Sequence, residues 1–177
     1  MLLALAAFSA PATAARAGFH VQFPWVIRKQ ANVVPKGMRQ VMQSFLPFCG
    51  DIIRNPQIYS GNDTTFLSFS GNSGDLVTVI YTSNRAPRSR EDFTIPIVAD
   101  VPIHPSGQLC FNVTMPAVSL FPQYGVFYFE ARDPKTEEIE YFCSDVKLKD
   151  DIILAVEHPA MCAGNNETLI PMPDEYL

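Results

Sequence analysis

The chain has 177 residues, a formal net charge of −5 at pH 7 and a pI near 5.1, which fit one domain with a mildly acidic surface. A surface of this sign repels phosphate backbones, so nucleic acid is excluded as a partner. The 13 phenylalanines, the 15 prolines and a charged fraction of only 18% favour many short strands between turns over long amphipathic helices. We therefore expect an all-β protein.

Residues 2–15 form a short apolar segment that ends in small residues, as a secretory signal peptide does, although no basic residue precedes it. The segment is too short to span a bilayer, so no transmembrane segment is expected. Ala15-Arg16-Ala17 is the best small-x-small cleavage site and leaves Gly18 at the mature amino terminus. We expect a signal peptide at 1–17, one domain at 18–162 and a polar tail at 163–177.

The first expected element of the mature chain is a strand at 18–23, because apolar residues alternate there and stop at Pro24. Residues 36–45 place apolar side chains at helical spacing and predict a short helix or an irregular crossover. Strand-like runs separated by turns follow at 65–70, 76–82, 94–98, 108–115, 124–132 and 139–148. About seven short strands predict an immunoglobulin- or fibronectin-like β-sandwich.

Four cysteines, an even number, fit an oxidising compartment and two disulfides among Cys49, Cys110, Cys143 and Cys162. Sequons for N-glycosylation occur at Asn62, Asn112 and Asn166. Together with the signal peptide, these features predict a secreted glycoprotein, extracellular or at the cell surface.

Period-2 alternation assigns faces to the two strands that contain cysteines. In the strand at 109–114, Cys110 shares a face with Asn112, and in the later strand Cys143 shares a face with Asp145. Both faces are expected to point outward, which favours pairing Cys110 with Cys143 and Cys49 with Cys162, and which puts Asp145 near the surface. Four cysteines allow three connectivities, and the other two stay open.

The sequence around the cysteines carries a resemblance to a known family. Its motifs are Phe23-Pro24, Phe48-Cys49-Gly50, Leu109-Cys110-Phe111-Asn112-Val113, Phe142-Cys143-Ser144-Asp145-Val146 and the late Cys162. In this order they resemble the fungal copper acquisition factors, which are related to lytic polysaccharide monooxygenases. The resemblance implies an immunoglobulin-like sandwich that binds Cu(II) through an amino-terminal His, a second His and an Asp, for copper uptake at the cell surface.

The ligands that this resemblance implies are only partly present. His20 and Asp145 are the candidate metal ligands, but cleavage before Gly18 makes His20 the third mature residue, and residues 71–75, where the second His is expected, contain none. An alternative is a square plane made by the amine, two backbone amides and the imidazole of Gly18-Phe19-His20, which requires a flexible start. His104 and His158 match no ligand position and are expected to be ordinary loop residues.

These observations predict a secreted copper acquisition factor-like protein with a degenerate copper site, no catalytic residues and no enzymatic activity. Its expected partners are a copper ion or a cell-surface component. The alternative is a non-catalytic extracellular or cell-wall binding module without metal. The loop at 84–90 carries three arginines that suit an anionic glycan or lipid head group, although Glu91 and Asp92 next to it favour an ordinary solvated loop.

Overall fold

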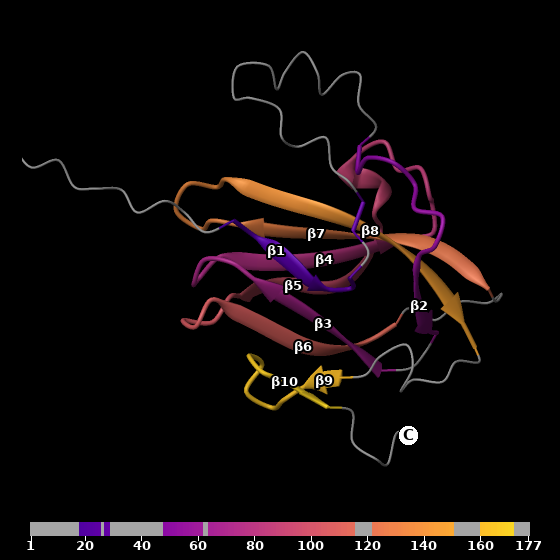
Figure 1. Ribbon diagram of the computed structural model, residues 1–177. Coiled ribbons are helices and arrows are strands. Elements are labelled where there is room, and N and C mark those ends of the chain that lie inside the picture. The colour runs from indigo at the N-terminus through magenta and orange to yellow at the C-terminus, as the bar shows by residue number, and fades with distance from the viewer. Residues whose placement is uncertain are drawn as a thin grey trace, which may run out of the picture.

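The computed structural model describes residues 18–25, 27–28, 48–61, 64–115, 122–150 and 160–171. Within these residues the protein is an all-β sandwich of two layers, and the only helical element is the single 3-10 turn η1 (Arg90–Asp92) (Figure 1). The predicted all-β sandwich is therefore confirmed. The expected signal peptide and the expected helix at 36–45 lie outside the described residues.

The smaller layer is a three-stranded antiparallel sheet in the order β1-β3-β6. Its strands are β1 (His20–Phe23), β3 (Thr64–Ser70) and β6 (Gln108–Thr114). A shift in the pairing of β1 with β3 falls between Val21 and Phe23, just before the chain leaves the sheet at Pro24. All three strands correspond to runs predicted from alternation.

The larger layer is a five-stranded sheet in the order β2-β8-β7-β4-β5. Its strands are β2 (Gln57–Ser60), β4 (Leu76–Thr82), β5 (Ile95–Pro102), β7 (Gln123–Arg132) and β8 (Ile139–Lys149). The pairing of β2 with β8 is parallel and every other pairing in this sheet is antiparallel. β2 is too short to show alternation, so the sequence did not predict it.

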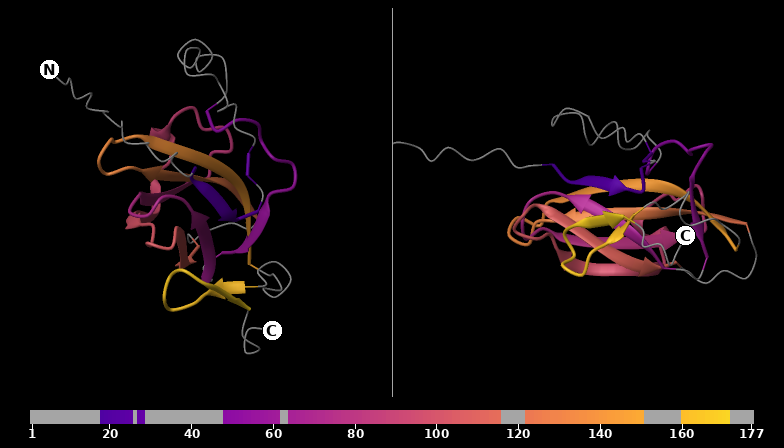
Figure 2. Two further views of the ribbon diagram at one scale, coloured as in Figure 1. Left: turned by 60° about the vertical axis from the view of Figure 1, so that its left-hand side comes forward. Right: turned by 60° about the horizontal axis from the view of Figure 1, so that its bottom comes forward.

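A separate two-stranded hairpin, β9 (Ala160–Cys162) and β10 (Leu169–Pro171), lies beside β3 and β6 at one edge of the sandwich (Figures 1 and 2). β10 falls within the segment predicted to be a polar tail. Within the described residues, no helix is long and apolar enough to cross a membrane.

The main core lies between the two layers and is dominated by aromatic side chains. Phe69 of β3 packs against Phe19 at a ring-centroid distance of 5.7 Å and against Phe129 of β7 at 5.6 Å. Phe127 of β7 meets the rings of Tyr59 and Tyr81 edge-on. The contact between Phe69 and Phe129 joins the two sheets, and this aromatic core explains why phenylalanine is so abundant in the chain.

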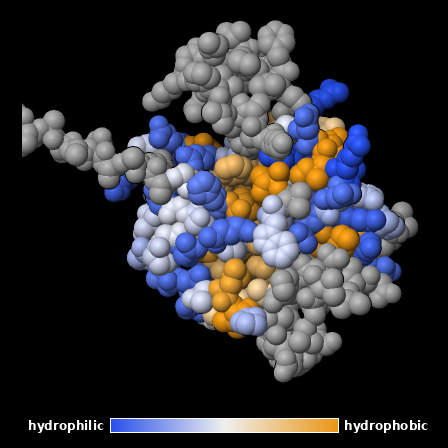
Figure 3. All heavy atoms as spheres, in the orientation of Figure 1, coloured by the Kyte–Doolittle hydropathy of each residue, from blue (hydrophilic) through white to orange (hydrophobic). Residues whose placement is uncertain are grey.

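A second cluster covers the opposite face of the five-stranded sheet. It consists of Cys49, Ile80, Phe93, Val126, Tyr128 and Cys143, with Phe48 and Tyr141 packed against it. This cluster corrects the expectation that the Cys143 face of β8 points to solvent, because the chain around residues 48–53 lies over that face. On the solvent side, Figure 3 shows hydrophobic residues scattered among hydrophilic ones on one face of the molecule.

The disulfides pair Cys49 with Cys143 and Cys110 with Cys162. The prediction that Cys110 pairs with Cys143 was therefore wrong. Cys110 belongs to β6 in the smaller sheet and Cys143 to β8 in the larger one, so the two strands are not neighbours. Cys49–Cys143 instead joins the larger sheet to the chain around residue 49, and Cys110–Cys162 joins the smaller sheet to β9 at its edge.

Candidate functional site

The expected mature amino terminus lies at the start of β1. Phe19 is only 2% exposed, and its ring packs against Phe69 and Phe142 in the main core. His20 follows as the first residue of β1, paired with Ser70, and its side chain is exposed. Burial of Phe19 therefore anchors this end of the chain and presents Gly18 and His20 on the outside.

The imidazole of His20 lies over Gly18. A Cβ atom on Gly18 would be 3.6 Å from the His20 Nε2 atom and 3.8 Å from Cε1. The backbone nitrogen of Gly18 is two bonds from that position. Cleavage before Gly18, which the sequence predicts, would turn this nitrogen into an amine in the same short segment as the imidazole.

A carboxylate from the larger sheet reaches the same segment. The Phe19 N–H donates a hydrogen bond of 2.6 Å to Oε2 of Glu140, near the start of β8. Glu140 thus brings a hard oxygen donor and a negative charge to the peptide that joins Gly18 and His20. The Glu140 carboxylate and the segment that carries the His20 imidazole therefore lie at the same corner of the sandwich.

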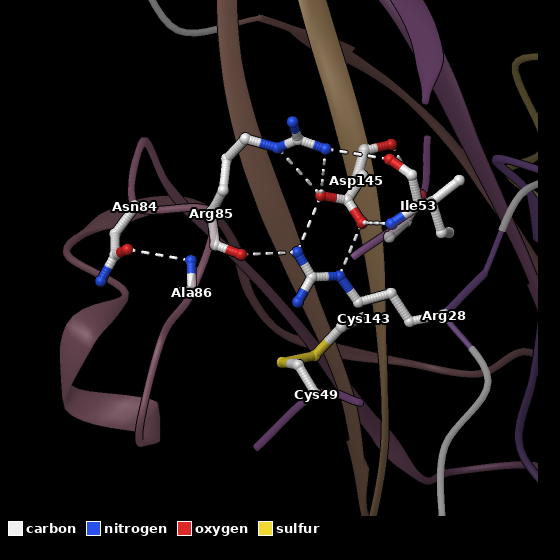
Figure 4. A network of polar contacts seen from close by, with 9 residues as sticks. Arg28, Cys49, Ile53, Asn84, Arg85, Ala86, Cys143 and Asp145 are labelled. Carbon is white, nitrogen blue, oxygen red and sulfur yellow. Dashed lines mark hydrogen bonds and ion pairs between the residues drawn. A yellow bond between two sulfur atoms is a disulfide. The ribbon is translucent and has the colours of Figure 1, made fainter. Parts of the chain in front are cut away.

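Asp145 has a different environment from the one expected. Its side chain is fully buried, and its carboxylate accepts hydrogen bonds of 2.7 Å from both Nε and Nη2 of Arg28 (Figure 4). The backbone N–H of Ile53 donates a third bond of 2.9 Å to Oδ2. The expectation that Asp145 lies near the surface was wrong, because Arg28 and the chain around Ile53 cover this face of β8.

A second arginine shares the same carboxylate. Arg85 donates from Nε at 3.4 Å and from Nη2 at 3.3 Å to Asp145 Oδ1, while its Nη2 also donates to the Ile53 carbonyl. The Arg85 carbonyl in turn accepts a bond from Arg28 Nη2. The Arg85 guanidinium lies 4.9 Å from the ring centroid of Tyr124. This network links three distant segments of the chain around one buried charge.

The structure does not bring His20 and Asp145 together. Glu140 is bonded to Phe19, the residue before His20, and Asp145 is five residues further along β8, roughly 16 Å at the rise of a strand. Asp145 also uses both oxygens on arginine and backbone donors. Across the described part of the chain, no three His, Cys, Asp or Glu side chains are grouped so as to hold a metal ion.

The remaining predicted residues lie apart from this corner. His104 pairs through Nδ1 with Oε1 of Glu167 at 2.8 Å and is half exposed, as expected of a loop histidine. Asn112 pairs both amide atoms with the backbone of Cys162. Asn166 is exposed in the turn between β9 and β10. His158 and Asn62 lie outside the described residues.

Sequence reasoning missed Glu140, Arg28 and the role of Arg85. Arg28 belongs to a polar stretch with no periodicity, so no local pattern marked it as buried. Arg85 was noted only as part of a basic loop. Glu140 was one of several acidic residues near the start of a strand. Only the packing of Phe19 against the larger sheet shows that Glu140 is the one that contacts the expected amino terminus.

The sequence matches no family model and no curated protein. Among solved structures, an AA10 lytic polysaccharide monooxygenase from Streptomyces lividans is 16% identical over 52% of this chain and 59% of its own, with a TM-score of 0.43. A lytic polysaccharide monooxygenase from Kitasatospora papulosa is 16% identical over 55% and 53%, with a TM-score of 0.44. The likeness concerns the sandwich fold alone and spans little more than half of either protein.

The comparison corrects one prediction. We predicted from the sequence that the protein has no enzymatic activity, but both of these fold neighbours are monooxygenases. The prediction of a non-enzyme is therefore withdrawn. Neither neighbour is a copper acquisition factor, so that narrower resemblance rests on the sequence motifs.

Proposed function

We propose that the protein is a secreted, copper acquisition factor-like protein that binds Cu(II) at its processed amino terminus, through the amine of Gly18 and the imidazole of His20. The observation that carries this proposal is the position of the His20 imidazole, 3.6 Å from where a Cβ of Gly18 would lie. The motifs around the cysteines support the same family of function. Bound copper would supply one-electron redox chemistry.

The donor set fits copper at this corner and not at Asp145. Amine and imidazole nitrogens are good ligands for Cu(II), and both belong to a segment that the buried Phe19 holds in place. Glu140 adds a negative charge beside them, which favours a bound cation. At Asp145, two guanidinium groups already surround the carboxylate, and a further cation there would meet like charge.

The two backbone amides are poor ligands in this arrangement. A square plane built on Gly18-Phe19-His20 requires the Phe19 and His20 amides to lose their protons. The Phe19 N–H is donated to Glu140, and His20 is paired with Ser70 in β1. Binding through the amine and the imidazole keeps both interactions, so this mode is the one we propose.

Isothermal titration of the secreted protein with Cu(II) tests the proposal. We expect one tight site that is lost in His20→Ala. His104→Ala should keep it, because His104 is an exposed histidine whose side chain is paired with Glu167. Gly18→Ala keeps the amine and places its methyl group at an ordinary contact distance from His20, so binding should persist. Full binding in His20→Ala would overturn the proposal.

A further inference from the structure

Two of the three predicted N-glycosylation sites lie in the part of the chain that the structure describes, and their surroundings differ. Asn112 belongs to β6 and is paired with Phe66 of β3, whereas Asn166 lies in the turn between β9 and β10. Both asparagines are exposed, so exposure does not distinguish the two sites. The hydrogen bonds of their side-chain amides do.

The Asn112 side chain uses both of its polar atoms on one neighbour. Its Oδ1 accepts the Cys162 N–H at 3.1 Å, and its Nδ2 donates to the Cys162 carbonyl at 3.3 Å. Because both bonds go to the same residue, the Nδ2 hydrogen that is donated points to the same side as Oδ1. The disulfide between Cys110 and Cys162 holds β9 against β6 beside these bonds.

A glycan on Asn112 would take the place of that hydrogen. N-glycosylation replaces one Nδ2 hydrogen by C1 of a sugar and turns the side chain into a secondary amide. A secondary amide prefers the trans form, as a peptide bond does, and this form puts the sugar carbon on the same side as the oxygen. That side of Asn112 faces the Cys162 backbone. Attachment would therefore remove the bond to the Cys162 carbonyl or force the amide into the cis form.

The backbone of Asn166 is fixed, whereas its side chain is not used. Its N–H donates to the Ala163 carbonyl at 3.1 Å, and its carbonyl accepts the Cys110 N–H at 2.7 Å. Its φ of 57° is a left-handed conformation that asparagine adopts more readily than most residues. Among the described residues, the side-chain amide of Asn166 has no hydrogen-bond partner, so either of its hydrogens can be replaced.

Neighbouring side chains hold the turn in place without Asn166. Glu167 pairs with His104 at 2.8 Å and so connects the turn to the loop before β6. Asn165 accepts the Thr168 N–H at 3.2 Å and donates to the Thr168 hydroxyl at 3.1 Å. None of these contacts uses the Asn166 amide, so a glycan on it leaves the turn and its contacts with the sandwich intact.

We propose that Asn166 carries an N-glycan in the secreted protein and that Asn112 carries none. The inference rests on the proposed secretion, because the sugar donor, a lipid diphosphate-linked oligosaccharide, is met in the secretory pathway. In the transfer, the bond between the sugar C1 and the diphosphate oxygen breaks and a bond between C1 and Asn166 Nδ2 forms. One amide proton is released and the lipid diphosphate leaves.

Site occupancy in the full chain, produced by a eukaryotic host and collected from the medium, tests the proposal. Peptide N-glycosidase converts a glycosylated asparagine to aspartate and leaves an unmodified one as asparagine, so mass spectrometry of the peptides reads each site. We expect Asn166 to be recovered as aspartate and Asn112 as asparagine. Asn62, which lies outside the described residues, is read separately from its own peptide.

Two matched variants each remove one glycosylation signal and keep the asparagine. Thr168→Val should lower the apparent mass on a denaturing gel by one glycan, and Thr114→Val, also at an exposed position, should leave it unchanged. A glycan on Asn112, or an unmodified Asn166 in protein recovered from the medium, overturns this inference alone, because copper titration of the same sample tests the copper site separately. Absence of the chain from the medium overturns the proposed secretion and this inference with it.

Discussion

Arg28 and Asp145 form a bidentate ion pair in which both nitrogen–oxygen distances are 2.7 Å, and their side chains are 1% and 0% exposed. The pair joins the segment that follows β1 to the middle of β8. A buried charge pair is strongly destabilising to break, because the remaining partner stays unpaired in a low-dielectric environment. The Arg28–Asp145 pair therefore fixes the segment that follows β1 against the larger sheet.

Replacing Asp145 by asparagine tests this relationship. The amide keeps the shape of the side chain but leaves Arg28 and Arg85 without a counter-charge, so we expect a loss of about 3–5 kcal/mol in the free energy of unfolding. Urea denaturation of the protein measures this loss. Asp100→Asn is the control, since Asp100 is 61% exposed in its pair with Arg132 and should change stability by less than about 1 kcal/mol. Equal losses in both variants would contradict the role given to Asp145.

The disulfide pairing makes a separate prediction. Peptide mapping without reduction should recover Cys49 joined to Cys143 and Cys110 joined to Cys162. The bridges span 94 and 52 residues, so on chain entropy alone each stabilises the fold by about 4–5 kcal/mol, and replacing either pair by serine should cost about that much. A peptide containing Cys110 joined to Cys143 would show that the strands are arranged differently.

Alkaline pH should weaken the fold through Tyr81. Burial raises the pKa of Tyr81 to about 12, whereas an unfolded tyrosine titrates near about 10. Between these values the unfolded chain loses the proton and the folded chain keeps it, so stability is intact below about pH 10 and falls by up to about 1.4 kcal/mol per pH unit above it. Urea denaturation across this window should show a shallower decline in Tyr81→Phe. An unchanged slope in that variant would rule out Tyr81 as a source.

Gly125 in β7 should not tolerate a side chain. A Cβ there would lie well inside contact distance of the ring and hydroxyl of Tyr81, which is fully buried. We expect Gly125→Ala to cost about 1–3 kcal/mol of stability, as overpacking usually does. Gly164→Ala provides the comparison, because nothing lies within 4 Å of the added atom. If thermal unfolding shows the two variants to be equally stable, the packing of Tyr81 against β7 is wrong.

The Asn112 side chain substitutes for a strand neighbour. Its Oδ1 accepts the Cys162 N–H at 3.1 Å and its Nδ2 donates to the Cys162 carbonyl at 3.3 Å, next to the bridge to Cys110. Asn112→Ala removes both bonds and should cost about 1–3 kcal/mol in urea denaturation. Asn55→Ala, at an exposed position outside the strands, should cost less. The reverse order would contradict this interpretation of Asn112.

Strand positions were predictable where alternation was long enough to read. The run at 76–82 was predicted with the bounds that β4 has, and the strands at 108–115 and 139–148 were each within one residue at both ends. β2 and the strands of the β9–β10 hairpin, at three or four residues each, are too short to carry a period. Alternation located the strands of seven or more residues and, among the short strands that the structure describes, only β1.

Predicting the candidate sites required knowing which strands are neighbours, and alternation along the sequence does not contain that information. Alternation grouped Cys110 with Asn112 and Cys143 with Asp145 and placed both faces outward, but both cysteines are fully buried and the two strands belong to different sheets. Asp145 looked exposed because the covering Arg28 comes from a distant, aperiodic segment. The role of His20 stays a prediction that depends on its distance from the expected cleavage site, and Glu140 came to notice only through its bond to Phe19.

Electron paramagnetic resonance of protein that begins at Gly18, loaded with one equivalent of Cu(II), tests the copper site most directly. The comparison is the same protein with one extra residue before Gly18. The proposed site predicts a spectrum with coupling to the amine and imidazole nitrogens in the mature form, and loss of the amine contribution with much weaker binding in the extended form. Identical spectra and affinities in the two forms would show that copper, if bound, is held elsewhere.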